Sequence, residues 1–178
     1  AQIALRRIKV HHSWGWRRTL PDGESLYRRS MYTVWKRMTP PPAMMNFDTS
    51  ERNLCSIKRQ STSTPLQALV LMNDPQFVEA SRILAERMIL EGGPSDADRI
   101  SFGFRALTSR SPNEGELETL TELLRLETQS FRQTPEAASL LLKTGEYPRS
   151  LSLDASEVAA YATVASTIMN FDATTILR

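Results

Sequence analysis

The sequence predicts an all-α protein: an irregular bundle of about five or six helices, preceded by a basic, partly irregular N-terminal segment. Three observations lead to this prediction. Helix-start signals, several of them a capping residue followed by proline, recur from about residue 61 onward. Apolar residues between those signals recur at helical spacing. The connections between the apolar stretches are short, which suits antiparallel helical neighbours.

The first 60 residues have weaker periodicity. Apolar residues between positions 3 and 10 fit a short strand or a frayed helix equally well. A short helix is predicted over residues 25–37, and it must end before the three prolines at 40–42, because proline lacks an N–H and restricts the residue before it. The stretch from Pro40 to Asn53 is therefore expected to be irregular and extended.

The later helices are predicted to begin at caps, each of which satisfies unpaired backbone N–H groups and contributes about 1 kcal/mol. Residues 64–67 read as a capping box with proline in the first turn, and Asp74-Pro75 repeats the pattern. The remaining starts are predicted at Ser95–Asp98, at Ser111–Glu114 with Pro112 in the first turn, at Thr134-Pro135, and at Asp154–Glu157. Gly92-Gly93 is predicted to end the helix that begins after Asp74.

Four apolar faces between these starts have the spacing of buried helix surfaces. They consist of Phe77, Ser81, Leu84 and Met88; of Ile100, Phe104 and Leu107; of Leu117, Leu120, Leu124 and Phe131; and of Val158, Tyr161, Ala162, Ala165, Ile168 and Met169. The small residues of the last face predict close packing, and residues 143–152 are predicted to form a loop over the bundle. We therefore divide the chain into a basic, aromatic-rich segment, residues 1–60, that packs on a helical bundle, residues 61–178.

Composition excludes some classes of protein. Forty per cent hydrophobic and 24% charged residues are typical of a folded domain, and no apolar run approaches the roughly 20 residues that span a bilayer. The chain begins without Met and without a signal-peptide pattern, so we expect it to be a piece of a longer protein. The net charge of +2 is unevenly spread, since residues 1–60 carry +8 and residues 61–178 carry −6. Such a split predicts an anionic partner for the first part, or its docking on the second.

The candidate partner-binding residues combine the cations of the N-terminal segment with its tryptophans. They are Arg28, Arg29, Lys36, Arg37, Arg52, Lys58, Arg59, Trp14, Trp16 and Trp35. The favoured interpretation is that the aromatic rings anchor the segment to the helices while arginine stems cover apolar surface. Contact with an acidic protein ranks next. Single-stranded nucleic acid, held by stacking and phosphate contacts, is the least favoured of the three.

Three carboxylates form a candidate set for general acid–base chemistry: Asp48, Glu51 and Asp74. Two of them have a simpler interpretation, because Asp74 reads as a helix cap and Glu51 can pair with Arg52. No nucleophile motif or glycine-rich phosphate loop accompanies them.

No metal or cofactor is expected in this chain. His11 and His12 are the only histidines, and adjacent residues do not share a face of a helix or a strand. Cys55 is the only cysteine, so it can form neither an internal disulfide nor a c-type haem attachment, which needs two thiols. We interpret it as a half-buried small residue rather than a reactive thiol.

Several stretches of the chain resemble a known family. They are Tyr27–Arg37, Pro40–Pro42, Phe47-Asp48, Glu51-Arg52, Cys55, Lys58–Gln60, Thr62, Thr64–Leu71, Asn73–Ala80, Phe104-Arg105, Ser109-Arg110, Pro112, Glu116, Ala165-Ser166 and Asn170–Asp172. Together they are similar to a planctomycete-type C-terminal module of unassigned function. It occurs in large exported proteins, often downstream of a cytochrome c-like domain. The resemblance runs from Ser25 to Arg178, and residues 1–20 match it poorly.

The resemblance implies an extracytoplasmic setting and a haem-bearing domain elsewhere in the full protein; it supplies no catalytic residues and implies no haem in this chain. We predict a non-catalytic structural or interaction module of a larger exported, cytochrome c-linked assembly. Its expected partners are upstream domains of the same protein or an acidic protein. The alternatives are a carbohydrate-directed enzyme module using Asp48, Glu51 and Asp74, and nucleic-acid binding through the basic aromatic segment.

Overall fold

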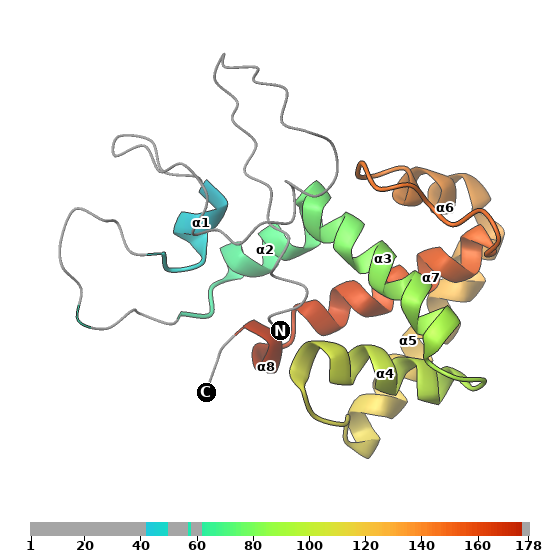
Figure 1. Ribbon diagram of the computed structural model, residues 1–178, viewed down its shortest axis with the longest axis horizontal. Helices are drawn as coiled ribbons and strands as arrows, with labels where there is room; N and C mark the ends of the chain where they lie inside the picture. The colour runs from blue at the N-terminus through green and yellow to red at the C-terminus, as the bar shows by residue number, and fades with distance from the viewer. Residues whose placement is uncertain (1–41, 50–56, 58–61, 176–178) are drawn as a thin grey trace, which may run out of the picture.

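The computed structural model describes residues 42–49, 57 and 62–175. Within this part of the chain 74% of residues are helical, no strand occurs, and eight helices pack as a bundle, six of them with at least seven residues. The predicted all-α bundle is confirmed (Figure 1). In chain order the helices are α1 (Pro42–Asn46), α2 (Pro65–Asn73), α3 (Pro75–Glu91), α4 (Asp96–Thr108), α5 (Glu114–Gln133), α6 (Pro135–Leu142), α7 (Ala155–Met169) and α8 (Asp172–Thr175).

Four of the predicted helix starts are confirmed by their caps. At α2 the Thr64 hydroxyl accepts from the Gln67 N–H at 3.3 Å, and the Gln67 side chain accepts from the Thr64 N–H at 3.2 Å. Asp74, Ser95 and Asp154 cap α3, α4 and α7 in the same manner, each accepting from a backbone N–H in the first turn. These starts follow from residues within one turn of each other, which is why sequence alone predicts them.

The predicted start of α5 needs correction, whereas α6 begins at Pro135 directly after Thr134, as predicted. The N-cap of α5 is Asn113, not Ser111, because Asn113 and Glu116 form the reciprocal box, with both hydrogen bonds at 2.8 Å. At α6 Thr134 occupies the cap position, yet its hydroxyl donates to Ser130 O at 3.0 Å and caps nothing.

The expectation of an extended stretch from Pro40 to Asn53 is wrong over α1. Pro42 stands in the first turn of this short helix, where its missing N–H costs nothing. The helix is followed by Asp48 in the left-handed region, with φ of 54°, a conformation that aspartate tolerates better than most residues. The helix predicted over residues 25–37 lies outside the described residues.

The core is built around α7, which packs against α3, α5 and α6. Buried alanines at 159, 160, 162 and 165 remove side-chain bulk from α7, so the neighbouring helices approach it closely, as predicted. The other three predicted faces also point into the core, although Leu117 and Phe131 pack at its margin and are only partly buried. In Figure 1 α4, α5 and α6 lie at one end of the molecule, and α1 and α2 lie at the other.

Candidate functional site

All ten candidate partner-binding residues lie outside the part of the chain that the structure describes. They are Trp14, Trp16, Arg28, Arg29, Trp35, Lys36, Arg37, Arg52, Lys58 and Arg59. Glu51, His11, His12 and Cys55 also fall there. Of the sequence-predicted site residues, the structure therefore places only Asp48 and Asp74.

Asp48 ties α1 to the start of α2. Its carboxylate accepts hydrogen bonds from the Thr62 N–H at 2.8 Å and from the Thr62 hydroxyl at 2.8 Å. The amide of Gln67 donates to Asn46 O at 2.7 Å, so the capping residue of α2 also holds the last residue of α1. Asp48 is thus a structural acceptor at a chain junction.

Asp74 lies at the C-terminal end of α2. Its carboxylate accepts from the Gln76 N–H at 2.9 Å, and its own N–H donates to Val70 O. The nine residues of α2, about 13 Å long at 1.5 Å per residue, lie between Asp74 and Thr62, to which Asp48 is bound. Paired catalytic carboxylates in glycoside hydrolysis lie roughly 5–9.5 Å apart, so the structure does not bring Asp48 and Asp74 together as such a pair.

An exposed apolar row runs along α2, and we call it the α2 row. Leu66, Leu69 and Met72 are 52%, 56% and 59% exposed. Their spacing of three residues puts them on one side of the helix, while Gln67 and Leu71 face the protein. Three large apolar side chains on one side of a helix, each slightly more than half exposed, form a patch of the kind that marks interaction surfaces.

A buried charged cluster lies on α3, and sequence reasoning missed it. Glu79, Arg82 and Glu86 are 6%, 2% and 9% exposed. Arg82 pairs with Glu86 at 3.1 Å and donates to Tyr147 O at 2.7 Å. Since charged side chains are rarely buried unless paired, each partner here stabilises an otherwise costly burial.

The loop between α6 and α7 covers this cluster. The Glu79 carboxylate accepts from the N–H groups of Glu146 at 3.0 Å and Tyr147 at 3.1 Å. Gly145 has φ of +104°, and a Cβ added there would lie 2.7 Å from Glu79 Cδ. The glycine therefore lets the loop backbone approach the carboxylate. A loop over the bundle was predicted for residues 143–152, but the carboxylate beneath it was not.

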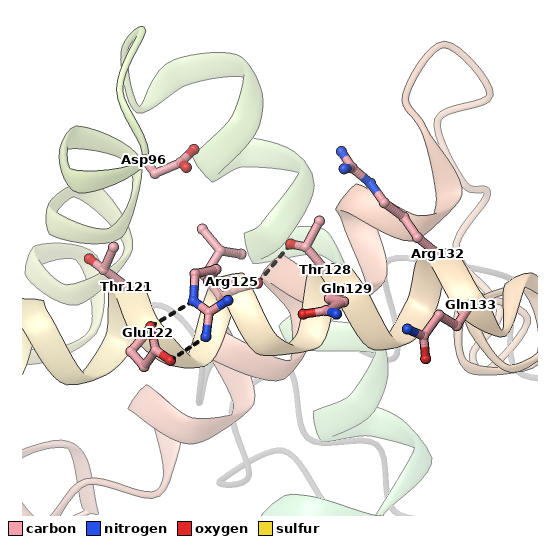
Figure 2. A pocket seen from close by; sticks show the side chains of 9 residues that line it. Asp96, Thr121, Glu122, Arg125, Thr128, Gln129, Arg132 and Gln133 are labelled. Atoms are coloured by element: carbon pink, nitrogen blue, oxygen red, sulfur yellow. Dashed lines mark hydrogen bonds and ion pairs between the residues drawn. The ribbon is translucent and has the colours of Figure 1, made fainter.

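An open groove of about 660 Å³ runs along α5 beside the start of α4 (Figure 2). Figure 2 shows Arg125 paired with Glu122 and Arg132 extended away from the helix. The lining residues are Asp96, Thr121, Glu122, Leu124, Arg125, Thr128, Gln129, Arg132 and Gln133. Two acids balance two arginines, so the lining offers polar contacts without selecting ligands by charge.

Two polar contacts lie at the two ends of α4. The Tyr161 hydroxyl donates to Asp96 at 2.7 Å, and burial raises the pKa of the Tyr161 phenol above its ordinary value. Just beyond the C-terminal end of α4, Arg110 binds Glu116 in the first turn of α5 with two hydrogen bonds of 2.6 and 2.8 Å. Those bonds, and then the Asn113 N–H, lower the pKa of Glu116 to about 2. The Tyr161–Asp96 contact holds the start of α4 in place, and the Arg110–Glu116 contact holds the start of α5.

Among the described residues, no group of three or more His, Cys, Asp or Glu side chains is arranged to hold a metal ion. In the same part of the chain, none of the helices has the length and apolar character that crossing a bilayer requires.

One comparison with known proteins gives a match. A family model described as "PSD1: Protein of unknown function (DUF1553)" matches residues 7–124, more than half of the chain. The match begins at residue 7, ahead of the start expected at Ser25. It ends within α5, short of the end expected at Arg178. No curated protein and no solved structure matches the chain.

Proposed function

We propose that this chain, which belongs to the PSD1 family of proteins of unknown function (DUF1553), is a non-catalytic interaction module of a larger exported, cytochrome c-linked assembly. The resemblance to a planctomycete-type C-terminal module supports the exported setting and the haem domain elsewhere. The partner is an acidic protein surface, on an upstream domain of the same protein or on a separate chain. The cations of residues 1–60 contact it, and the helical bundle serves as the rigid base.

The observation that carries this proposal is the lack of charged residues in the two described helices that follow the basic residues in sequence, α1 and α2. The sequences of α1 and α2, PAMMN and PLQALVLMN, contain no Lys, Arg, Asp or Glu. Asp48, between them, is already bound to Thr62. Helices α1 and α2, which adjoin the basic residues in sequence, therefore offer no countercharge to the +8 charge of residues 1–60, and this supports an anionic surface elsewhere as its partner.

The charges of the bundle support the same conclusion because five of its eight described arginines bind its own carboxylates. The pairs no longer than 3.1 Å are Arg82–Glu86, Arg87–Glu91, Arg99–Glu157, Arg110–Glu116 and Arg125–Glu122. With these arginines paired and a net charge of −6 over residues 61–178, the bundle is a poor source of positive charge for recognition, so that charge comes from the N-terminal segment.

The test measures binding of fluorescein-labelled poly-L-glutamate by anisotropy, with an oligo-dT single strand as the competing probe. Reversing Arg28, Arg29, Lys36 and Arg37 to Glu should weaken poly-L-glutamate binding by about tenfold or more, since four direct contacts each contribute. The matched control reverses four bundle cations, Arg105, Arg132, Lys143 and Arg149, and makes the same change in net charge. It should alter the affinity by no more than about threefold, through long-range screening alone.

Three outcomes overturn the proposal. Equal losses of poly-L-glutamate affinity in the two variants would show that binding depends only on the net charge of the protein. Much tighter binding of oligo-dT, lost in the first variant, would favour nucleic acid. Hydrolysis of a polysaccharide panel that Asp48→Asn or Asp74→Asn abolishes would favour the carbohydrate-directed enzyme.

A further inference from the structure

Helix α2 is apolar all round, although one side of it faces water. Of its nine residues only Gln67 and Asn73 are polar, and Leu71 on the inner side is 4% exposed. A helix with apolar residues on every face is typically buried on every face. We therefore expect another polypeptide segment to bind the outer side of α2, which carries the α2 row.

The chain itself brings a cover to this place. The Gln67–Asn46 and Thr62–Asp48 hydrogen bonds fix α1 beside the start of α2, and residues 1–41 are joined to α1 at Pro42. That stretch holds all three tryptophans of the protein, Trp14, Trp16 and Trp35. A fully buried aromatic side chain removes about 150–250 Å² of surface from water, so two rings suffice to cover three half-exposed aliphatic side chains.

Charge and family boundaries favour the same occupant. The uncharged α2 offers no ion pair to the segment, so contact between them has to be apolar, and its aromatic residues are the groups that can make it. The family match covers residues 7–124, so the same family model includes most of the basic segment together with α2, α3 and α4. A segment that belongs to the domain is a better candidate cover than a foreign chain.

We propose that the α2 row is the docking surface for the chain's own N-terminal segment, through the tryptophan rings between residues 14 and 35. Leu66, Leu69 and Met72 take the rings, and the arginines between the rings stay on the outer side. The same contact thus orients the cations of the segment away from the bundle. This inference goes beyond the proposed function, because the docking holds whether or not an acidic partner exists.

Tryptophan fluorescence tests the docking directly, because every tryptophan lies in the segment and none lies in the described bundle. Leu69→Glu and Met72→Glu place a charge in the α2 row. Each should shift the emission maximum to longer wavelength and raise the acrylamide quenching constant about twofold, as rings leave an apolar surface for water. Leu69→Met should preserve the wild-type spectrum.

The matched control is Leu140→Glu on α6, where the side chain is 67% exposed on a different face. It introduces the same charge and should leave emission and quenching unchanged. Far-UV circular dichroism should show full helicity in all variants, because the substituted side chains contribute little to the core.

The proposal fails if the wild-type protein emits like N-acetyltryptophanamide, or if Leu69→Glu and Met72→Glu leave the emission of a fully helical protein unchanged. A third result would also overturn it: light scattering that shows a wild-type dimer, dissociated by Leu69→Glu without any change in emission. The cover would then be a second copy of the chain.

Discussion

Removing Arg82 is the most demanding test of how the bundle holds its loop. The Arg82 side chain is 2% exposed. It pairs at 3.1 Å with Glu86, whose side chain, taken without its backbone, is 12% exposed. It also donates to Tyr147 O at 2.7 Å. Arg82→Met keeps much of the aliphatic stem but removes every donor, so a carboxylate and a carbonyl lose their strongest described partner at once.

The magnitude follows from these two losses. Breaking a buried ion pair from one side costs about 3–5 kcal/mol, and a buried acceptor without a donor costs about 1–3 kcal/mol. The Ser150 N–H, 3.4 Å from Glu86, offsets a small part of the loss. We expect a decrease of about 4 kcal/mol in the free energy of unfolding, or roughly 10 °C in melting temperature.

Urea unfolding followed by circular dichroism measures this difference, with two companion variants. Arg87→Met removes an exposed pair on the same helix, 43% and 50% exposed, and should cost less than about 1 kcal/mol. Arg82→Met combined with Glu86→Gln should recover at least about 1 kcal/mol, because no buried charge is left alone. The reasoning is refuted if Arg82→Met is no worse than Arg87→Met, or if the double variant is less stable than the single one.

The remaining predictions concern the loop and two caps. Gly145→Ala should cost about 2 kcal/mol or more, because φ is +104° and the new Cβ would meet the Glu79 carboxylate; equal urea midpoints would contradict this. Glu116→Gln should lower the melting temperature by about 2–4 °C at pH 7. Since Arg110 helps to hold the pKa of Glu116 at about 2, below the ordinary 4.5, this contribution is present above pH 4.5 and disappears as the pH falls toward 2; a difference between variant and wild type that widens in acid would count against it. Thr64→Ala should cost about 1 kcal/mol through the lost cap of α2, and an unchanged melting temperature would show that the cap contributes nothing.

Features that depend on neighbours within one helical turn were predicted well. The cap at Thr64, the cap at Asp74 and the stop at Gly92 are set by local hydrogen bonds and backbone preferences. The α5 start shows the limit of that reasoning. Ser111 and Asn113 are both good caps, and the choice between them depends on Arg110, which holds Glu116 in the position that favours Asn113.

The buried cluster on α3 could not be predicted by periodicity. Glu79, Arg82 and Glu86 lie on the side of α3 opposite Phe77 and Leu84, and a charged row on that side usually faces solvent. Their burial depends on a loop about 65 residues away along the chain, whose backbone supplies the missing hydrogen bonds. The pattern of residues within α3 therefore cannot predict a contact with a segment so far away in the sequence.

The sequence by itself determined that this chain is helical, where most of its helices begin, and which stripes enter the core, because those properties rest on hydrogen bonds and side-chain spacing within one turn. Only the tertiary structure decided which charged residues are buried and which apolar ones stay in water. Those choices depend on how much surface distant segments cover: the α6–α7 loop covers Glu79 on α3, while the side of α2 that carries Leu69 stays half exposed.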